Sequence, residues 1–327
     1  MKFMMGQESL AFLAMRQYEY SAPEPCYFLA TRGLVDNRVF VSNRGRVSVF
    51  PLYGLVNEAG AQAGLFSITR RTNLSAQFLR NLRDRLAIQS SETDRLPDGL
   101  TPETIFHYAY AVFHSPTYRT RYAEFLKIDF PRLPLTSSLD LFRELARLGG
   151  ELVALHLVEA VAQQALSVRY DKAAKAWRYE VAKGQRLPVT LSFDGPAKPV
   201  VEKVNRSNTT VWLDKARTMD FRGVPENVWN FHIGGYQVCE KWLKDRKNRT
   251  LTAEDIVHYH RIVIALHETI RIMREIDEAI NAHGGWPGAF ASTAQSPEAK
   301  DAIGSRTPQR GKRASARVDL QQPNLFG

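Results

Sequence analysis

The sequence predicts an α+β fold, in which strands and helices are grouped along the chain rather than alternating regularly. Three observations lead to this prediction. Short apolar runs separated by turn residues occupy positions 9–53, patterns with a helical period follow over about 75–160, and strand-like alternation returns over 166–233, before one long helical pattern. The chain has 327 residues, of which 44% are hydrophobic and 24% charged, which is typical of a globular protein.

The first part of the chain is predicted to form strands. Four short apolar runs are separated by turn residues, and they cover positions 10–14, 27–31, 38–41 and 47–50. The first and the last of these runs are too apolar for a sheet with one face in water. Such runs are typical of central strands that are covered on both faces.

Four helices are predicted next, each from a start signal. Ser75 can cap a helix over about 75–88. Thr101 and Ser115 are each followed by a proline, which fits the first helical position, so helices are expected to start there, the second of them running to about Phe125. A fourth helix is predicted over about 139–160, with the glycine pair at 149–150 as a possible break.

Further strands and one long helix complete the prediction. The strands are expected at 168–170, 177–181 and 208–213, with a short helical turn at 225–229. Thr252 and Asp255 have the spacing of a capping box. Up to the Gly284-Gly285 stop, apolar residues then recur at alternating spacings of three and four, with Asp277 as the one break, at Ile256, Tyr259, Val263, Leu266, Ile270, Met273 and Ile280. This helix is about 30 residues long, or roughly 45 Å, and is interpreted as a column of a helical bundle.

Composition limits the classes of function. Lys and Arg exceed Asp and Glu by 44 to 34, a net charge of +10, which favours a polyanionic partner but also occurs without one. No apolar run is long enough to cross a membrane, and two cysteines without a Cys-x-x-Cys spacing indicate a reducing, cytoplasmic setting. We therefore expect a cytoplasmic protein without a membrane partner.

No catalytic constellation is recognisable in the sequence. There is no glycine-rich nucleotide loop and no Gly-x-Ser-x-Gly elbow. His258 and His260 would lie about 200° apart around a helix, so we expect no metal site. Asp245-Arg246-Lys247 has the form of a nuclease core, but its place before a helix cap favours a solvated charged loop.

Two long motifs resemble a known family. They are HSPTYRTRYAEFLKIDFPRLP from His114 to Pro134, and VWNFHIGGYQVCEKWLKDRKNRTLTAEDIVHYHRIV from Val228 to Val263. Over roughly 10–283 the chain resembles the C-terminal specificity region of Type ISP restriction-modification enzymes, which fuse an adenine-N6 DNA methyltransferase to a target-recognition domain. Within the second motif, Gly234-Gly235 allows close backbone approach or positive φ, and Trp242 is expected in the core.

The resemblance implies a domain organisation. Residues 1–60 would be the end of a methyltransferase sheet and 61–287 a mixed helical and β target-recognition domain. For 288–327, a composition rich in small, polar and basic residues predicts a disordered basic tail. The family's S-adenosylmethionine loop and Asn-Pro-Pro-Tyr motif are absent from this sequence. We therefore expect no catalytic or cofactor-binding residue in this chain, although a complete family member would bind S-adenosylmethionine. Methyl transfer by the purified chain would contradict this expectation.

Double-stranded DNA is the partner that the resemblance implies, and basic or amide side chains are the candidates to contact it. They are Arg44, Arg46, Arg70, Arg71, Arg119, Arg121, Lys127, Arg132, Arg206, Asn208, Lys241, Lys244, Arg246 and Lys247. The alternative is an inactive fragment or subunit that associates with a separate methyltransferase or nuclease chain through an open sheet edge. An independent enzyme has no recognisable site to support it.

The C-terminus suggests one further partner. Gln322, Leu325 and Phe326 form a Gln-x-x-Leu-Phe pattern that resembles the motif by which bacterial proteins dock on the replication sliding clamp. If clamp binding were unchanged after Leu325 and Phe326 were replaced by alanine, this hypothesis would fail.

Overall fold

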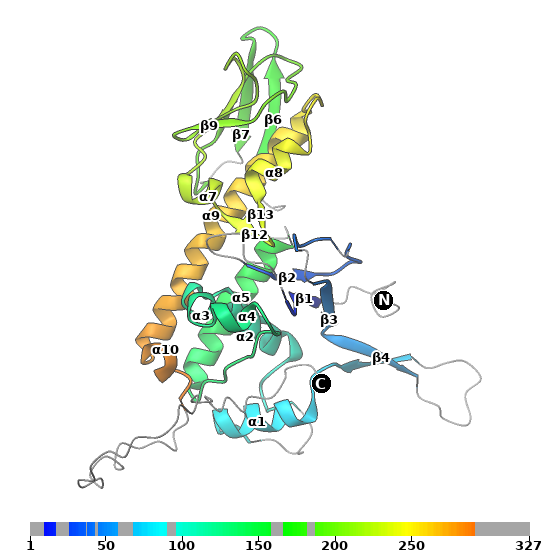
Figure 1. The fold of residues 1–327 in the computed structure, drawn as a ribbon, viewed down its shortest axis with the longest axis vertical. Coiled ribbons are helices and arrows are strands. Elements are labelled where there is room, and N and C mark those ends of the chain that lie inside the picture. Colours follow the sequence, from blue (N-terminus) through cyan, green and yellow to red (C-terminus); the bar gives the residue numbers. More distant parts are fainter. Residues whose placement is uncertain are drawn as a thin grey trace, which may run out of the picture.

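The computed structural model describes residues 10–291 except 18–25, 37, 43–44, 58–67, 90–95, 158–165 and 182–186. The molecule is elongated and has two lobes joined by the long helix α9 (Ala253–Ala282) (Figure 1). The N-terminal lobe contains the segments between 10 and 157, and the β lobe contains those between 166 and 251. Each lobe has its own hydrophobic core, so two separate bodies of apolar side chains stabilise the fold.

The N-terminal lobe contains a three-stranded antiparallel sheet. Its strands are β1 (Ala11–Met15), β2 (Phe28–Thr31) and β3 (Val47–Pro51), in the order β2-β1-β3. Every residue of β1 is buried, as its apolar sequence predicts. The same prediction is wrong for β3, which is a half-buried edge strand.

The predicted strand at 38–41 does not form. Its residues make a turn and bends, and the amide of Val41 donates to the carbonyl of Gly234 at 2.6 Å. The apolar side chain that suggested a strand, Phe40, is buried in the N-terminal core. Contacts with a distant segment therefore take the place of strand pairing at 38–41.

A second antiparallel ribbon, which was not predicted, extends from the lobe (Figure 1). It consists of β4 (Tyr53–Asn57) and β5 (Ile68–Thr72).

The predicted helix starts are confirmed. The hydroxyl oxygens of Ser75, Thr101 and Ser115 accept hydrogen bonds from the amides of Phe78, Thr104 and Tyr118. The third helix is divided at Tyr122. The helices of this lobe are α1 (Ala76–Leu86), α2 (Pro102–His114), α3 (Pro116–Arg121), α4 (Ala123–Leu126) and α5 (Leu139–His156), and the proline-containing segment before α5 is neither helix nor strand.

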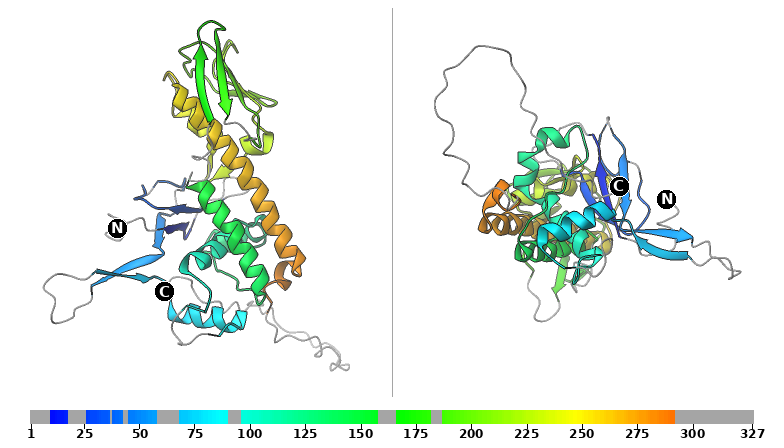
Figure 2. Two further views of the ribbon diagram at one scale, coloured as in Figure 1. Left: turned by 180° about the vertical axis from the view of Figure 1, so that it is seen from behind. Right: turned by 90° about the horizontal axis from the view of Figure 1, so that it is seen from below.

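The glycine pair does not break α5. A Cβ atom on Gly149 would lie 1.9 Å from the carbonyl oxygen of His107 on α2. The missing side chain thus permits the two helices to approach closely, and α2 and α5 form the main helical packing of the lobe (Figure 2).

The β lobe consists of a hairpin, a small sheet and two short helices. The hairpin pairs residues 166–171 with 176–181 and confirms the strands predicted at 168–170 and 177–181. The strand predicted at 208–213 is shorter than expected, because Asn208 lies in a turn with a φ of 53°. All pairs are antiparallel, and the sheet order is β8-β11-β10-β9. The elements are β6 (Leu166–Asp171), β7 (Ala176–Val181), β8 (Ser192–Asp194), β9 (Asn205–Ser207), β10 (Thr210–Trp212), β11 (Asp220–Arg222), α7 (Glu226–Trp229) and α8 (Val238–Lys244).

Helix α9 belongs to both cores. The capping box at Thr252 and Asp255 is present as predicted. Ile256 and Val263 in its first half are buried in the core of the β lobe, whereas Ile272 and Ile276 in its second half are buried in the N-terminal core. One continuous helix therefore fixes the two lobes to each other (Figures 1 and 2).

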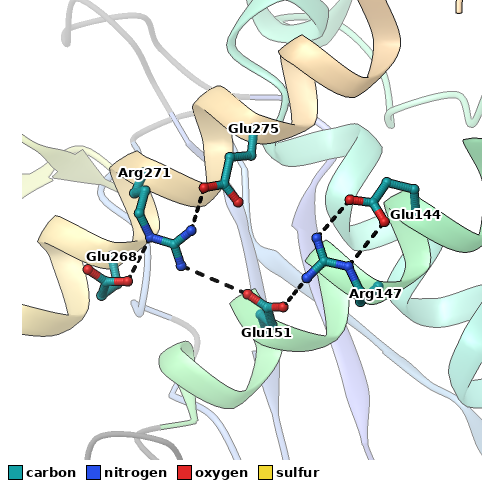
Figure 3. Close-up of polar contacts among 6 residues, drawn as sticks. All are labelled: Glu144, Arg147, Glu151, Glu268, Arg271 and Glu275. Carbon is teal, nitrogen blue, oxygen red and sulfur yellow. Dashed lines mark hydrogen bonds and ion pairs between the residues drawn. The ribbon is translucent and has the colours of Figure 1, made fainter. Parts of the chain in front are cut away.

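Charged side chains also link α5 to α9. Arg147 on α5 pairs with Glu144 and Glu151, and Arg271 on α9 pairs with Glu268 and Glu275 (Figure 3). A longer contact of 3.9 Å between Arg271 and Glu151 joins the two sets. The hydrogen bond from Arg147 is the main reason that the pKa of Glu144 is lowered.

A second connection between the lobes is a tight hairpin of β12 (His232–Ile233) and β13 (Tyr236–Gln237). Both glycines of its turn have positive φ, 58° at Gly234 and 86° at Gly235, as the glycine pair predicted. The amide of Gly234 donates to the carbonyl of Cys26 at 2.7 Å. A Cβ on Gly234 would lie 2.3 Å from the Phe40 ring, so glycine permits this docking.

The described residues continue to 291, beyond the predicted start of the tail at residue 288. After α10 (Gly285–Gly288), Ala289 and Phe290 are buried in the N-terminal core, and Arg85 donates to the carbonyl of Phe290 at 3.0 Å. The rest of the predicted tail lies outside the described residues. The boundary predicted at residue 60 stays a prediction, and β1–β3 share one core with α2 and α5.

No helix in the described ranges is both long and apolar enough to cross a bilayer.

Candidate nucleic-acid interface

Four predicted contact residues carry charges that are available at the surface. The side chains of Arg46, Arg71, Arg121 and Lys247 are exposed, and they make no hydrogen bond or ion pair in the part of the chain that the structure describes. An exposed cation without a partner can bind a phosphate without first losing an internal ion pair. These four are therefore the strongest of the predicted phosphate contacts.

Arg46 belongs to a basic cluster at one end of the β1–β3 sheet. Met15 is opposite Val47 in the register, so the next position along both strands brings Arg46 beside Arg16. Arg16 forms a 3.4 Å ion pair with Asp129 from the segment after α4. The sequence prediction missed Arg16, because only the strand register reveals its neighbour.

Two further predicted residues lie on the segment that contacts this sheet. The ring of Phe130 packs against Phe50 of β3 with centroids 5.5 Å apart. Close in sequence, Lys127 pairs with Glu124 at 2.6 Å, and the guanidinium of Arg132 lies 4.9 Å from the centroid of the Phe125 ring. Both cations are half-buried and already engaged, so their charge is less available than that of Arg46.

Arg119 does not belong to the surface set. Its side chain is only 6% exposed, and none of its guanidinium nitrogens has a hydrogen-bond partner. The nearby His114 is also buried; desolvation, with Arg119 as the next cause, lowers the pKa of this imidazole to about 3. Arg119 and Arg121 both lie on the short helix α3, and the sequence does not indicate which of them is exposed. In the fold only Arg121 lies at the surface.

The β lobe contributes Arg206 and Asn208 at the β9–β10 turn. Arg206 is half-buried, with its Nε atom buried and without a hydrogen-bond partner. Asn208 is exposed, and its φ of 53° is a conformation that asparagine adopts more readily than most residues. The turn conformation therefore favours asparagine at position 208, independently of any contact with DNA.

Most of the predicted basic residues in α8 and just after it are neutralised by acids. Lys241 pairs with Asp245 at 2.5 Å, and Lys244 with Glu240 at 2.9 Å. Lys247 is the exception, as described above. The structure therefore reduces a predicted cluster of four cations to one that is unpaired in the described ranges.

Arg246 connects the end of α8 to the start of α9. It pairs with Asp255 at 3.2 Å, and its guanidinium lies 3.5 Å from the centroid of the Trp242 ring. Trp242 packs against Tyr259 of the β-lobe core, as predicted. The Asp245-Arg246-Lys247 triplet is thus part of an ion-paired helix junction, and no group of three metal-ligating side chains occurs among the described residues.

The remaining candidates lie outside what the structure describes. Arg44, Gln322, Leu325 and Phe326 are not in the described ranges, and Arg70 is described only by its backbone on β5.

Comparison with known proteins defines the family. Residues 1–275 match the family model described as the Type ISP C-terminal specificity domain. The chain therefore belongs to this family, as the two sequence motifs predicted. A search of curated proteins gave no significant match.

Solved structures with a similar fold come from larger proteins. The ATP-dependent Type ISP restriction-modification enzyme LlaBIII bound to DNA shares 16% identity at a TM-score of 0.51, covering 84% of this chain and 16% of that one. The DrdV–DNA complex shares 24% identity (TM-score 0.49; 84% and 25% covered). A nuclease-deletion mutant of the Type ISP enzyme LlaGI with a DNA substrate mimic shares 15% identity at a TM-score of 0.47, covering 83% of this chain and 21% of that one. This chain thus spans a quarter or less of each neighbour, and the LlaBIII match supports the mixed helix and strand fold.

Proposed function

We propose that this chain recognises a specific sequence in double-stranded DNA, as the specificity part of a restriction-modification DNA methyltransferase. Membership of the Type ISP specificity family is the observation that carries the proposal. The DNA-bound state of LlaBIII and the four exposed, unpaired cations of this chain support it.

Two kinds of contact would share the work in this proposal. Arg46, Arg71, Arg121 and Lys247 would bind phosphates, which supplies affinity without sequence information. Asn208 at the β9–β10 turn has an exposed amide of the kind that reads base edges in the major groove. Sequence choice would then depend on the β lobe, and phosphate contacts would be distributed over both lobes.

Methyl transfer would need a different part of a complete enzyme. This sequence lacks the S-adenosylmethionine loop and the Asn-Pro-Pro-Tyr motif, and the chain corresponds to 16–25% of its structural neighbours. We therefore propose that methyltransferase and nuclease activities, with S-adenosylmethionine as cofactor, belong to a longer polypeptide or to a separate chain.

Salt dependence of DNA binding tests the proposal. The dissociation constant of the purified chain for a DNA duplex should rise with salt, because bound cations release counterions from DNA. Arg121→Gln, which removes an unpaired cation, should reduce the slope of log K against log salt by about one. Lys241→Gln is the matched control and should change the slope less, because Asp245 already neutralises Lys241.

Two outcomes would contradict this assignment. Equal affinity for all duplex sequences would contradict sequence-specific recognition. DNA binding that is insensitive to salt would contradict the proposed phosphate contacts. Salt-insensitive association with a methyltransferase chain, without affinity for DNA, would support the alternative of an inactive partner subunit.

A further inference from the structure

A cavity of about 560 Å³ lies at the boundary between the lobes, apart from the cations described above. α7 and β12 line it from the β lobe, α9 lines it along its middle, and the first residue of α3 completes the lining. Ligand sites of a few hundred cubic ångströms commonly occur at such boundaries. The volume fits a single nucleotide.

The walls of this cavity are fixed by contacts of their own. Asp277 on α9 accepts hydrogen bonds from the hydroxyl of Ser115 and from the amide and hydroxyl of Thr117, at 3.1 and 2.7 Å for the latter two. On the opposite side, the amide group of Gln237 donates to the carbonyl of Trp229 at 2.7 Å and ties β13 to α7. These hydrogen bonds hold the elements that form the cavity walls to one another.

One cation in the lining is left without a counter-ion. Arg274 is exposed and forms no ion pair or hydrogen bond within the described part of the chain. The acid one turn away, Asp277, is committed to Ser115 and Thr117. By contrast, Arg271 on the same helix contacts three glutamates, two of them at 2.8 and 2.5 Å (Figure 3).

Amide and imidazole groups accompany Arg274 in the lining. Asn227 and Asn230 are exposed, and their side-chain amides have no partner among the described residues. The Nδ1 atom of His232 lies 2.7 Å from the carbonyl oxygen of Asn230, so Nδ1 donates and Nε2 remains an acceptor. Phe231 and Met273 supply apolar surface against which a planar ring can pack.

We propose that this cavity binds one adenine nucleotide. Asparagine amides can hydrogen-bond both N6 and N7 of adenine, and the Nε2 atom of His232 can accept from its amino group. Arg274 binds the phosphate, for which a planar guanidinium provides paired donors. The nucleotide is either free or unpaired within DNA, and the proposal does not depend on sequence-specific recognition of duplex DNA.

Calorimetric titration of the full chain with AMP, adenosine and inorganic phosphate tests the site. AMP should bind, and Arg274→Gln should weaken AMP binding about tenfold while leaving adenosine binding unchanged. The double variant Asn227→Ala/Asn230→Ala should weaken the binding of both AMP and adenosine. Arg143→Gln is the matched control, because Arg143 is an exposed cation on α5 outside the cavity.

Competition then assigns the source of the nucleotide. A duplex with one unpaired adenine should displace AMP if the site takes a base from DNA, and should not if the site takes a free nucleotide; a fully paired duplex is the control. The proposal is overturned if neither AMP at up to about 10 mM nor the unpaired-adenine duplex shows binding that Arg274→Gln weakens. Unfolding temperatures of the variants equal to that of the parent chain show that each remains folded.

Discussion

Gly149 determines how closely α5 approaches α2. The carbonyl oxygen of His107 occupies the place that a Cβ atom would need, and that oxygen belongs to a rigid helix backbone. At Gly150, by contrast, a Cβ would lie 3.1 Å from the His107 side chain, which can move. Two adjacent glycines that are equivalent in sequence therefore have different roles in the fold.

Gly149→Ala should destabilise the protein by about 3 kcal/mol, because the two helices must separate to admit one methyl group. Gly150→Ala should cost clearly less, since alanine favours the helix by about 1 kcal/mol and offsets part of the new contact. Chemical denaturation of both variants measures the difference. Equal losses of stability would show that close helix approach does not depend on position 149.

The buried His114 and the half-buried His156 should make the protein sensitive to acid. Burial is the main cause that lowers the pKa of both His114 and His156 to about 3, and His156 is further affected by its neighbour His114. In the unfolded chain these groups take up protons near pH 6.5, so acidification favours the unfolded state. The contribution of these two histidines to stability should be constant above about pH 7, and it should fall as the pH decreases from 6.5 toward 3.

His156→Gln tests this assignment between pH 6 and 5. A plot of unfolding free energy against pH should be less steep for the variant, by up to about 1.4 kcal/mol per pH unit. The reason is that the variant takes up one proton fewer when it unfolds. Urea denaturation at several pH values gives the slope. His283→Gln, at an exposed histidine, is the control, and an unchanged slope in His156→Gln would contradict the prediction.

At the scale of elements, packing of α5 on α9 combines apolar contacts with an ion network. The carboxylate of Glu151 contacts both Arg147 and Arg271, so it joins the pairs of the two helices (Figure 3). All three side chains are about half exposed, at 41–53%, so solvent screens their interactions. The network therefore orients the helices more than it stabilises them.

Glu151→Gln should accordingly cost less than about 1 kcal/mol at low salt. The cost should decrease further near 1 M salt, where the Debye length is only about 3 Å. Denaturation at both salt concentrations measures it, with Glu278→Gln, an exposed residue of α9, as the control. A loss that is large and independent of salt would indicate a buried role for Glu151.

At the scale of the whole molecule, the two lobes are connected by more than a linker. α9 contributes buried residues to both cores, and the β12–β13 hairpin forms backbone hydrogen bonds to the N-terminal lobe. Loss of either core would remove one half of the packing of α9. The lobes should therefore unfold together, although separate domains often do not.

Ile276→Ala tests this coupling from the N-terminal core, where Ile276 is fully buried. The variant should lose about 3 kcal/mol, and both lobes should report one shifted transition. Trp286 reports on the N-terminal lobe, and Trp229 and Trp242 report on the β lobe. Val224→Ala is the matched change in the β lobe, and two separated transitions would show that the lobes unfold independently.

The sequence alone determined those features that depend on neighbouring residues. Short-range chemistry predicts the helix starts at Ser75, Thr101 and Thr252, the positive φ of Gly234-Gly235, and the two strands within 166–181. The family was recognisable because its two motifs are long.

Only the tertiary structure decided burial and charge pairing. The strand predicted at 38–41 is replaced by contacts with the Gly234 turn, Arg119 is buried whereas Arg121 is exposed, and Lys241 is neutralised by Asp245. The cavity that contains Arg274 brings together residues from three separate segments. The physical reason is that solvent exposure and ion pairing depend on which distant surfaces meet, whereas capping and turn preferences act within a few residues of the chain.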